Sequence, residues 1–335
     1  MAGRMPEGRA AEVARAHWGV DAIARRLDSE HDDAFRLSLP DGTARFLRVS
    51  APDPVGAEAS FLTAILGHLA RVAPELPVQR VITALDGSPE VLLGGRLVRM
   101  TTFLDGRLLS EVRSIPALRR DIGATLARLS RALRGFTHPA ARRTHLWDVQ
   151  SAHQLRPLLQ DLEATGTHVD GGVAEALDRF DAVVRPALTG ASTQVIHGDF
   201  HGENLLVAAD GVTIAGVLDF GDSLTGPVAM DVAVAACYQL GAQGGADLLA
   251  PALDVVAGYH AVDPLRPADL PLIRELIALR LATRIVVSQW NAAREPANSG
   301  YLLRRTAQAV EHFRTLRAMP PAAVLARLRA ACDLG

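Results

Sequence analysis

The sequence predicts an α+β protein with two lobes: a small N-terminal lobe of antiparallel strands plus a helix, and a larger, mostly helical C-terminal lobe. Three observations support this fold class. Short apolar segments separated by Gly, Pro and Asp turns fill residues 1–104. Over residues 105–335, apolar residues recur at the three- and four-residue spacing of amphipathic helices. A strand–loop–strand segment, residues 195–222, interrupts these helices and carries polar side chains where its strands end.

Length and composition limit the class of protein. The chain has 335 residues, of which 49% are hydrophobic, so it can bury a large core and is not a disordered chain. Its net charge of -2 gives no electrostatic case for binding nucleic acid or an anionic membrane. Cys237 and Cys332 make neither a disulfide framework nor a metal site. The opening residues MAGRMPEGRA lack the apolar segment of a signal peptide, and no run of about 20 apolar residues exists, so we expect a cytoplasmic protein.

The N-terminal lobe is predicted from alternating apolar residues and strong turn signals. Pro40-Asp41-Gly42 is a turn between two strands, and an apolar stripe predicts a helix over residues 55–70. A short helix is expected over residues 9–18. The expected strands are residues 23–27, a strand that ends at residue 37, and residues 44–49, 78–83, 90–93 and 97–103.

The C-terminal lobe is predicted from helical periodicity. Apolar residues at three- and four-residue spacing run from Ile115 to Leu133 and stop at Gly135. Asp231 precedes an apolar segment, residues 232–240, whose helix it could cap. The other helices are expected over residues 150–162, 173–188, 270–291, 301–316 and 322–332.

The segment VIHGDFHGENLLVAADGVTIAGVLDFGD, residues 195–222, carries the most specific motifs. Apolar residues 205–207 and 212–218 flank a tight turn and are expected to be strands. Four residues separate Asp199 from Asn204, and Asp219 is followed by Phe-Gly. Protein kinases have a catalytic Asp, then four residues, then a metal-binding Asn, and later Asp-Phe-Gly.

These motifs, HGD with Asn204 and then DFGD, resemble the aminoglycoside phosphotransferase and choline kinase branch of the protein kinase-like fold. The resemblance implies that Asp199 accepts the proton of the acceptor hydroxyl, while Asn204 and Asp219 hold Mg²⁺ on the phosphates of ATP or GTP. It also implies that His197 and Asp231 support the catalytic loop. The implied reaction transfers a γ-phosphoryl group from a nucleoside triphosphate to a hydroxyl of a small molecule.

The resemblance also implies a nucleotide site in the N-terminal lobe. Residues 27–37 are similar to the nucleotide loop of hydroxylysine kinase-like proteins, which places Ser29 near the phosphates. Arg48 stands on the third strand where the family has a phosphate-clamping Lys, and all 35 basic residues of this chain are Arg. Glu58, in the first turn of the next helix, is the expected partner of Arg48. The strand end that includes Met100 and Thr102 is expected to bind the nucleotide base.

Three further residues are predicted to bind the acceptor. Asp222 lies three residues beyond Asp219, where its carboxylate suits a substrate ammonium, although it also suits a turn. Arg280 and Arg284 share one helical face, which is either a solvated face or a grip for an acceptor carboxylate. Residues 27–37, 138–148 and 218–222 resemble hydroxylysine kinase-like proteins, which implies a small hydroxylated amino acid or amine, with 5-hydroxylysine the leading candidate.

Other functions share parts of this pattern. An aminoglycoside phosphotransferase or a choline- or homoserine-type kinase would have the same motifs. His197, Asp199 and His201 alternate as metallohydrolase ligands do, but that interpretation leaves Asn204 and DFGD unused. A nucleotide-binding pseudokinase is a hypothesis of another class, and Arg48 alone motivates it.

Overall fold

The computed structural model of the chain describes residues 4–29, 32–51, 57–170, 172–242 and 246–334; the side chains of residues 57–59 are outside this description. Backbone contacts divide the chain into two compact units. The first unit contains residues 1–106 with two short additions, residues 138–140 and 215–218. The second unit contains residues 107–137, 141–214 and 219–335.

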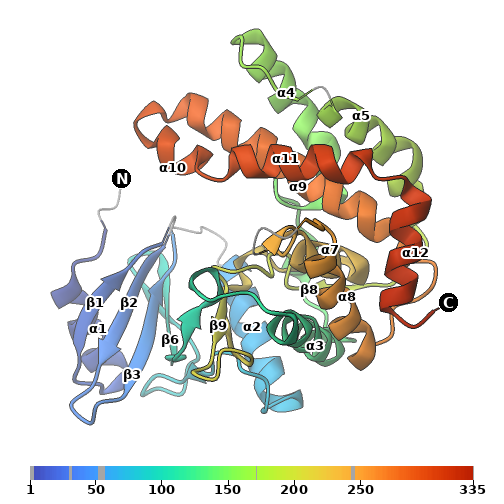
Figure 1. Cartoon of the computed structure of the whole chain (residues 1–335). Coiled ribbons are helices and arrows are strands. Elements are labelled where there is room, and N and C mark those ends of the chain that lie inside the picture. The colour runs from blue at the N-terminus through green and yellow to red at the C-terminus, as the bar shows by residue number, and fades with distance from the viewer. Residues whose placement is uncertain (1–3, 30–31, 52–56, 171, 243–245, 335) are drawn as a thin grey trace. The chain divides into compact units, whose positions relative to one another are not determined.

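The first unit is built on an antiparallel sheet with the strand order β1-β2-β3-β6-β4, in which β5 also pairs with β6 (Figure 1). Strand β3 lies in its middle, and Arg48 of β3 is directly opposite Arg99 of β6. The strands are β1 (Ile23–Leu27), β2 (Asp33–Ser38), β3 (Ala44–Val49), β4 (Val81–Ile82), β5 (Val91–Leu93) and β6 (Arg96–Thr102).

Two helices, α1 (Glu7–Trp18) and α2 (Ala57–Val72), belong to the first unit. The apolar residues of α1 pack against the sheet, and the Trp18 indole N–H donates to the Ile82 carbonyl at 2.8 Å. Helix α1 ends at Gly19, whose left-handed φ of 66° suits glycine. The core members that α1 and the sheet share are Ala10, Val13, Ala14, Trp18, Ala24, Phe35, Leu37, Leu47, Val49, Ala84, Val98 and Met100.

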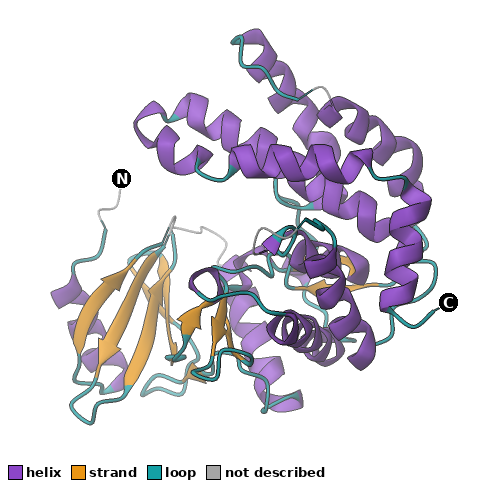
Figure 2. Cartoon of the chain, in the orientation of Figure 1, coloured by secondary structure: helices purple, strands orange, loops and turns teal. Residues whose placement is uncertain are grey.

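The second unit is mostly helical, as the colouring of Figure 2 shows. The described helices are α3 (Pro116–Leu133), α4 (Leu155–Ala164), α5 (Gly172–Arg179), α6 (Arg185–Leu188), α7 (Val228–Cys237), α8 (Ala250–Val262), α9 (Leu270–Arg294), α10 (Ser299–Leu303), α11 (Thr306–Ala318) and α12 (Pro321–Ala331). No described helix is both long enough and apolar enough to cross a membrane.

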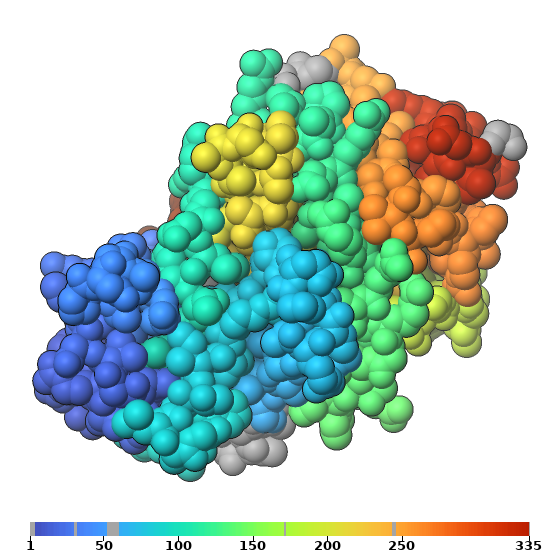
Figure 3. Space-filling model, turned by 90° about the horizontal axis from the view of Figure 1, so that it is seen from below, coloured from blue at the N-terminus to red at the C-terminus, as the bar shows by residue number. Residues whose placement is uncertain are grey.

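Helices α3 and α8 approach closely through two glycines. A Cβ atom on Gly123 would lie 2.0 Å from the Val255 carbonyl oxygen, and one on Gly258 would lie 2.0 Å from the Arg120 carbonyl oxygen. Any side chain at either position would therefore separate the helices. Helices α3 and α8 are seen side by side on the surface in Figure 3.

Short strands position the two polar loops of the second unit. Strand β8 (Thr193–Ile196) pairs antiparallel with β11 (Leu224–Pro227), with Ile196 opposite Leu224. The loop that follows β8 and the loop that precedes β11 therefore meet at the same end of this ribbon. Strand β9 (Leu205–Val207) pairs with β7 (Arg107–Leu108), and β10 (Ile214–Val217) follows the turn that Asp210 closes by accepting the Val212 and Thr213 N–H groups.

Several details differ from the sequence-based expectations. The strand expected over residues 78–83 is only Val81–Ile82, and the sequence did not predict β11 or α8. Asp231 does not cap the helix that follows it, because α7 begins at Val228 and contains Asp231 in its first turn. The helix begins earlier than expected because Pro227, with a φ of -64°, is its N-cap residue and Val228 is its first helical residue.

Candidate active site

The catalytic loop begins with a buried set of hydrogen bonds. Asp231, 3% exposed, accepts the backbone N–H groups of His197 at 2.9 Å and Gly198 at 2.8 Å. His197 is fully buried, packs against the Phe200 and Phe220 rings, and accepts the Asp199 N–H on Nδ1 at 3.3 Å. These contacts hold the backbone of the HGD segment. His197 and Asp231 are buried and support the loop from the protein interior, away from solvent.

Gly198 brings the two polar loops together. Its φ is 82°, and a Cβ atom there would lie 2.4 Å from the Asp222 carbonyl oxygen. The Ser223 hydroxyl donates to the His197 carbonyl at 3.4 Å across the same junction. Glycine is therefore required at this position both for its left-handed backbone and for the close approach of the second loop.

Asp199 is the centre of a polar cluster. Its Oδ2 atom accepts His201 Nε2 at 2.9 Å and Asn204 Nδ2 at 3.0 Å. Its Oδ1 atom accepts the Nη2 group of Arg280, which comes from helix α9. Burial acts to raise the pKa of Asp199, but the His201 imidazole and the Arg280 guanidinium outweigh it and hold the pKa well below its usual range. The Asp199 carboxylate is thus ionised at neutral pH.

Asn204 and Asp219 offer oxygen ligands of the kind that a hard divalent metal prefers. The Asn204 amide nitrogen donates to both the Asp199 carbonyl at 2.9 Å and its carboxylate, which leaves the amide oxygen to face elsewhere. Asp219 is solvent-exposed, has a left-handed φ of 48°, and accepts the Gly221 N–H. One amide oxygen and one carboxylate, completed by phosphate oxygens, match the way proteins bind Mg²⁺ with nucleotides.

The metallohydrolase alternative fits this geometry poorly. The Nδ1 atom of His201 accepts the Glu203 N–H at 3.1 Å, and its Nε2 atom bonds to Asp199. His197 Nδ1 already accepts a backbone N–H and its ring is buried between phenylalanines. Within the described ranges, no three His, Cys, Asp or Glu side chains are grouped to hold a metal on their own.

Asp222 belongs to the same charge cluster. Burial and the nearby Asp199 carboxylate raise its pKa, while His145 and Arg280 act in the opposite direction. Its carbonyl accepts His145 Nε2 at 3.3 Å. Arg143 holds the same loop by donating to the carbonyls of Gly221 and Ser223. Arg143 and His145 therefore support the second loop.

Arg280 does not lie on a solvated face. Its side chain is 2% exposed, and it lies over the Trp147 ring at 4.9 Å and the Tyr238 ring at 5.6 Å. Arg284, one helical turn further on, is partly exposed and lies 5.5 Å from the Tyr238 ring centroid. The two arginines share a face of α9 that points into the protein.

Both arginines line a cavity of about 360 Å³. Arg305, Gln308 and His312 are among the polar lining residues that the sequence did not predict, because only the fold brings α11 and the residue before it beside α9. Arg305 pairs with Glu203 of the catalytic loop at 3.0 Å, and burial lowers the pKa of His312, which favours the neutral imidazole. No Asp or Glu is among the described residues that line the cavity.

In the first unit, Arg48 donates through Nε to Asp32, at the end of the loop before β2. Its cross-strand neighbour Arg99 is buried, donates to Thr63 at 2.6 Å, and has a pKa that burial and Arg48 lower to about 10. Neither Asp32 nor Arg99 was predicted from the sequence. The expected partner Glu58 has a side chain outside the described residues, so the pair with Arg48 stays a prediction.

The other predicted nucleotide-binding residues, Ser29, Met100 and Thr102, differ in exposure and in backbone pairing. Ser29 follows β1 and is partly exposed. Met100 is fully buried in the core and paired on both sides, with Leu47 and Ile82. Thr102 ends β6, and its N–H and hydroxyl both bond to the Arg80 backbone, at 2.9 and 3.0 Å. Backbone groups for a nucleotide base are therefore expected beyond Thr102 rather than at Met100.

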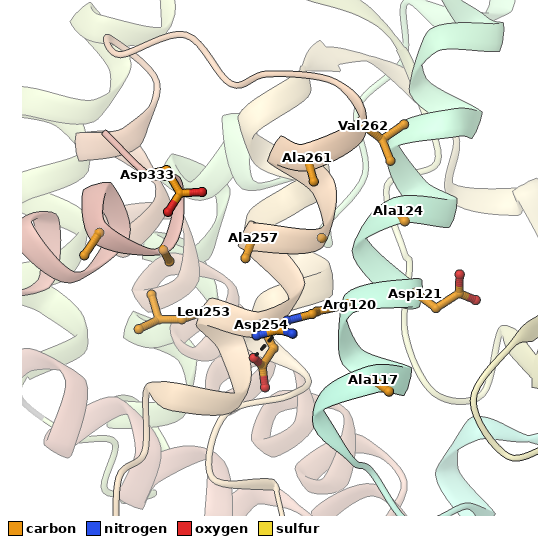
Figure 4. A pocket seen from close by; sticks show the side chains of 13 residues that line it. Ala117, Arg120, Asp121, Ala124, Leu253, Asp254, Ala257, Ala261, Val262 and Asp333 are labelled. Carbon is orange, nitrogen blue, oxygen red and sulfur yellow. Dashed lines mark ion pairs between the residues drawn. The ribbon is translucent and has the colours of Figure 1, made fainter. Parts of the chain in front are cut away.

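A second, larger cavity of about 690 Å³ lies among α3, α8 and the end of α12 (Figure 4). Alanines form much of its lining, and its one marked ion pair joins Arg120 to Asp254 at 3.7 Å. None of the predicted site residues lines it. It is therefore not the candidate active site.

An ionised Asp199 carboxylate bonded to the Asn204 amide, with Asp219 on the adjoining loop of the same strand ribbon, is typical of phosphotransferases with the protein kinase-like fold. The chain belongs to the phosphotransferase enzyme family, whose model (APH) matches residues 23–270. It is a small-molecule kinase that transfers a phosphoryl group to an alcohol. The site suits a nucleotide co-substrate and a divalent metal ion.

Among its relatives is a hydroxylysine kinase from Danio rerio, 26% identical over 324 residues, which cover 91% of this chain and 89% of that protein. A homoserine kinase from Methylorubrum populi is 32% identical over 244 residues, 69% of this chain and 70% of that protein. The solved amicoumacin kinase complex with AMP-PNP and Ca²⁺ has the same fold, with a TM-score of 0.64, 16% identity, and coverage of 98% and 94% of the two chains.

Proposed function

We propose that this kinase transfers the γ-phosphoryl group of ATP or GTP to the hydroxyl of a small hydroxylated amino acid, with 5-hydroxylysine the leading candidate. The observation that carries the proposal is the charge of the cavity beside Asp199. Arg280, Arg284 and Arg305 line it, and no carboxylate does so among the described residues. Asp199 and Glu203, which lie outside the lining, pair with Arg280 and Arg305, so Arg284 is the arginine whose charge is left to attract an acceptor carboxylate.

In this proposal Asp199 takes the proton of the acceptor hydroxyl, since it is ionised, buried and held in place. Asn204 and Asp219 hold Mg²⁺, which neutralises charge on the nucleotide phosphates when bound. The N-terminal lobe, residues 1–104, binds the nucleotide. There Arg48, with Glu58 as its partner, binds the phosphates, Ser29 lies in the covering loop, and backbone groups just beyond Thr102, at the end of the strand that contains Met100, meet the base.

The C-terminal lobe, residues 105–335, binds the acceptor. Arg284 is expected to bind the acceptor carboxylate, because it is the lining arginine without an ion-pair partner in the described part of the chain. Arg305 and Arg280 are already matched by Glu203 and Asp199. Asp222 is expected to meet the acceptor ammonium. Its raised pKa reflects a carboxylate that would gain from a cationic partner.

Homoserine is the second candidate acceptor. It also combines a hydroxyl, an ammonium and a carboxylate, and homoserine kinases from several bacteria are similar to this chain, at 30–33% identity. An aminoglycoside or choline acceptor has no carboxylate for Arg284. We therefore rank the acceptors that carry a carboxylate above those that do not.

The test is nucleoside diphosphate release with four acceptors: 5-hydroxylysine, homoserine, choline and kanamycin. We expect turnover of hydroxylysine, and the decarboxylated analogue of hydroxylysine is expected to lose about 10- to 100-fold in kcat/KM, since it leaves a charged donor unpaired. Turnover of homoserine alone would keep the carboxylate requirement and change the acceptor. Efficient phosphorylation of kanamycin, with none of hydroxylysine or homoserine, would overturn the proposal.

A further inference from the structure

Two successive carboxylates, Asp32 and Asp33, stand where the chain enters strand β2, and they have separate partners. Asp33 is the first residue of β2 and pairs with Arg26 and Arg96. Asp32, one residue earlier, accepts the Nε group of Arg48 on β3. Successive side chains of an extended chain point to opposite faces, which is why neighbouring carboxylates reach different arginines. The Asp32 carboxylate is therefore directed at the predicted phosphate-binding arginine.

Both oxygens of Asp32 are held in place. Oδ1 accepts the backbone N–H of Ala51, just beyond β3, at 2.7 Å, and Oδ2 accepts Arg48 Nε. The side chains of Asp32 and Arg48 are 13% and 24% exposed, so the pair is largely shielded from water. Because Nε is the guanidinium donor nearest the stem of the side chain, a bond at Nε also fixes the plane of the guanidinium. Asp32 thus determines how the Arg48 guanidinium is oriented.

A second arginine stands against Arg48 on the same sheet. Arg99 is directly opposite Arg48 across β3 and β6, is 8% exposed, and has a pKa that burial and the Arg48 charge both lower. Arg99 is itself held, because it donates to the Thr63 hydroxyl at 2.6 Å and pairs with Glu90 at 3.5 Å. Like charges at this separation repel each other. The Asp32 carboxylate offsets that repulsion at Arg48.

We propose that Asp32 is a positioning residue of the nucleotide site, which holds the Arg48 guanidinium against repulsion from Arg99 in the orientation that binds the nucleotide phosphates. This inference rests on the proposed role of Arg48. Asp32 acts on the phosphates through Arg48 and does not touch the nucleotide. The chain entering β2 and the phosphate clamp on β3 are then one unit, joined by a single carboxylate.

The test is a double-mutant cycle of Asp32→Asn and Arg48→Ala, measured by titrating the folded proteins with magnesium-ATP. With Arg48 present, Asp32→Asn is expected to weaken ATP binding about 10-fold, the size of one hydrogen bond to a charged group. In the Arg48→Ala background, the same substitution should change ATP affinity by less than about twofold, because the residue through which Asp32 acts is absent. Adenosine has no phosphate and should bind all four proteins equally.

Two neighbouring carboxylates supply the controls. Asp33→Asn removes the adjacent charge with its different partners, so it should lower stability and leave the ATP affinity of the folded protein unchanged. Asp41→Asn, in the exposed turn at the other end of the β2–β3 hairpin, should bind ATP as the wild type does. Thermal unfolding shows which variants are folded. If Asp32→Asn does not fold, Asp32→Ser, with a side chain one atom shorter, replaces it in the same cycle with the same expected result.

The outcomes separate this inference from the proposed function. If Asp32→Asn leaves ATP binding unchanged, or weakens it equally with and without Arg48, the positioning role is refuted while the kinase function stands. Equal loss of adenosine and ATP binding would show a structural role and also refute it. Tighter ATP binding by Asp32→Asn would mean that Asp32 competes with the phosphates for Arg48, which is the opposite of the proposal. If Arg48→Ala binds ATP as the wild type does, the proposed phosphate clamp itself is wrong.

Discussion

Replacing Asp199 by Asn separates the proposed base from the rest of the active site. Asn has nearly the same shape but cannot take the hydroxyl proton. A general base contributes about 10²–10⁴-fold to the rate, which corresponds to about 2.7–5.4 kcal/mol of transition-state stabilisation at 1.36 kcal/mol for each factor of ten. We expect kcat to fall by that factor, with nucleotide binding nearly unchanged, because Asn204 and Asp219 still hold the metal.

The same substitution also affects folding stability, because it leaves Arg280 without its carboxylate. The Arg280 side chain is only 2% exposed, and Asp199 is the one acidic partner it has in the described part of the chain. Removing one partner of a buried ion pair typically costs about 3–5 kcal/mol, and the Asn amide oxygen retains part of the hydrogen bond. We therefore expect Asp199→Asn to be less stable by a smaller amount, so its thermal unfolding should be measured beside its activity.

The assay is single-turnover phosphoryl transfer at saturating nucleotide, together with nucleotide titration of the folded variant. Asp219→Asn should show the opposite pattern, with weak binding of the metal–nucleotide complex, because it removes a ligand charge. Asp210→Asn is the matched control, since Asp210 only closes the exposed turn before β10. Near wild-type turnover by folded Asp199→Asn would refute the assignment of the base.

Three further substitutions test other parts of the molecule. Arg48→Ala should raise the nucleotide KM and Arg48→Lys should retain activity, as steady-state kinetics would show; an unchanged KM in Arg48→Ala would place the phosphate clamp elsewhere. Left-handed backbone strain costs a non-glycine residue about 1–2 kcal/mol. Gly198→Ala should lower the free energy of unfolding by more than this amount, because the added Cβ would also clash with the Asp222 carbonyl oxygen. Gly211→Ala, with a φ of 73° and no atom near the added Cβ, should show the cost of the strain alone. Asp33→Asn should lose about 3–5 kcal/mol at pH 7, because buried Asp33 pairs with Arg26 and Arg96. Burial acts to raise the pKa of Asp33, but a backbone hydrogen bond and these two arginines outweigh it and lower the pKa from 3.8. The stabilisation by the Asp33 carboxylate is therefore present above pH 3.8 and is lost as pH falls through the lower folded-state pKa. If the urea unfolding curves of the wild type and Asp33→Asn stayed equally separated below this pH range, the prediction would be wrong.

The motif residues were predictable because they are close in sequence. Asp199, Asn204 and Asp219 occur at a spacing that only a few enzyme classes share, and the turns around them are marked by Gly and Asp. The sheet of the first unit was predictable for a similar reason: residues 23–27 and 44–49 alternate and are bounded by turn signals, and both form strands with those bounds. Local patterns sufficed in each case.

The partners of these residues were not predictable in the same way. Strand β11 pairs with β8, and only this long-range pairing brings the two polar loops together. Helix α8 packs against α3, α7 and α12, so it is apolar on more than one face and lacks a simple amphipathic pattern. Arg305 contacts Glu203 of the catalytic loop although the two residues are 102 positions apart in the sequence. Such contacts depend on topology rather than on local residue types.

The position of Arg280 on helix α9 explains how one fold can combine a fixed reaction with variable acceptors. Helix α9 has 25 residues and packs against α4, α7, α11 and α12, so Arg280 and the Asp199 oxygen it contacts are held by the core of the second unit. Arg305, Gln308 and His312 line the same cavity from a region with fewer buried neighbours, around α10 and α11 (Figure 1). A substitution at Arg280 changes the base and the core together, whereas a substitution at Gln308 changes the cavity alone. Changes of acceptor are therefore expected to arise on the α10–α11 side, while the chemistry of Asp199 stays the same.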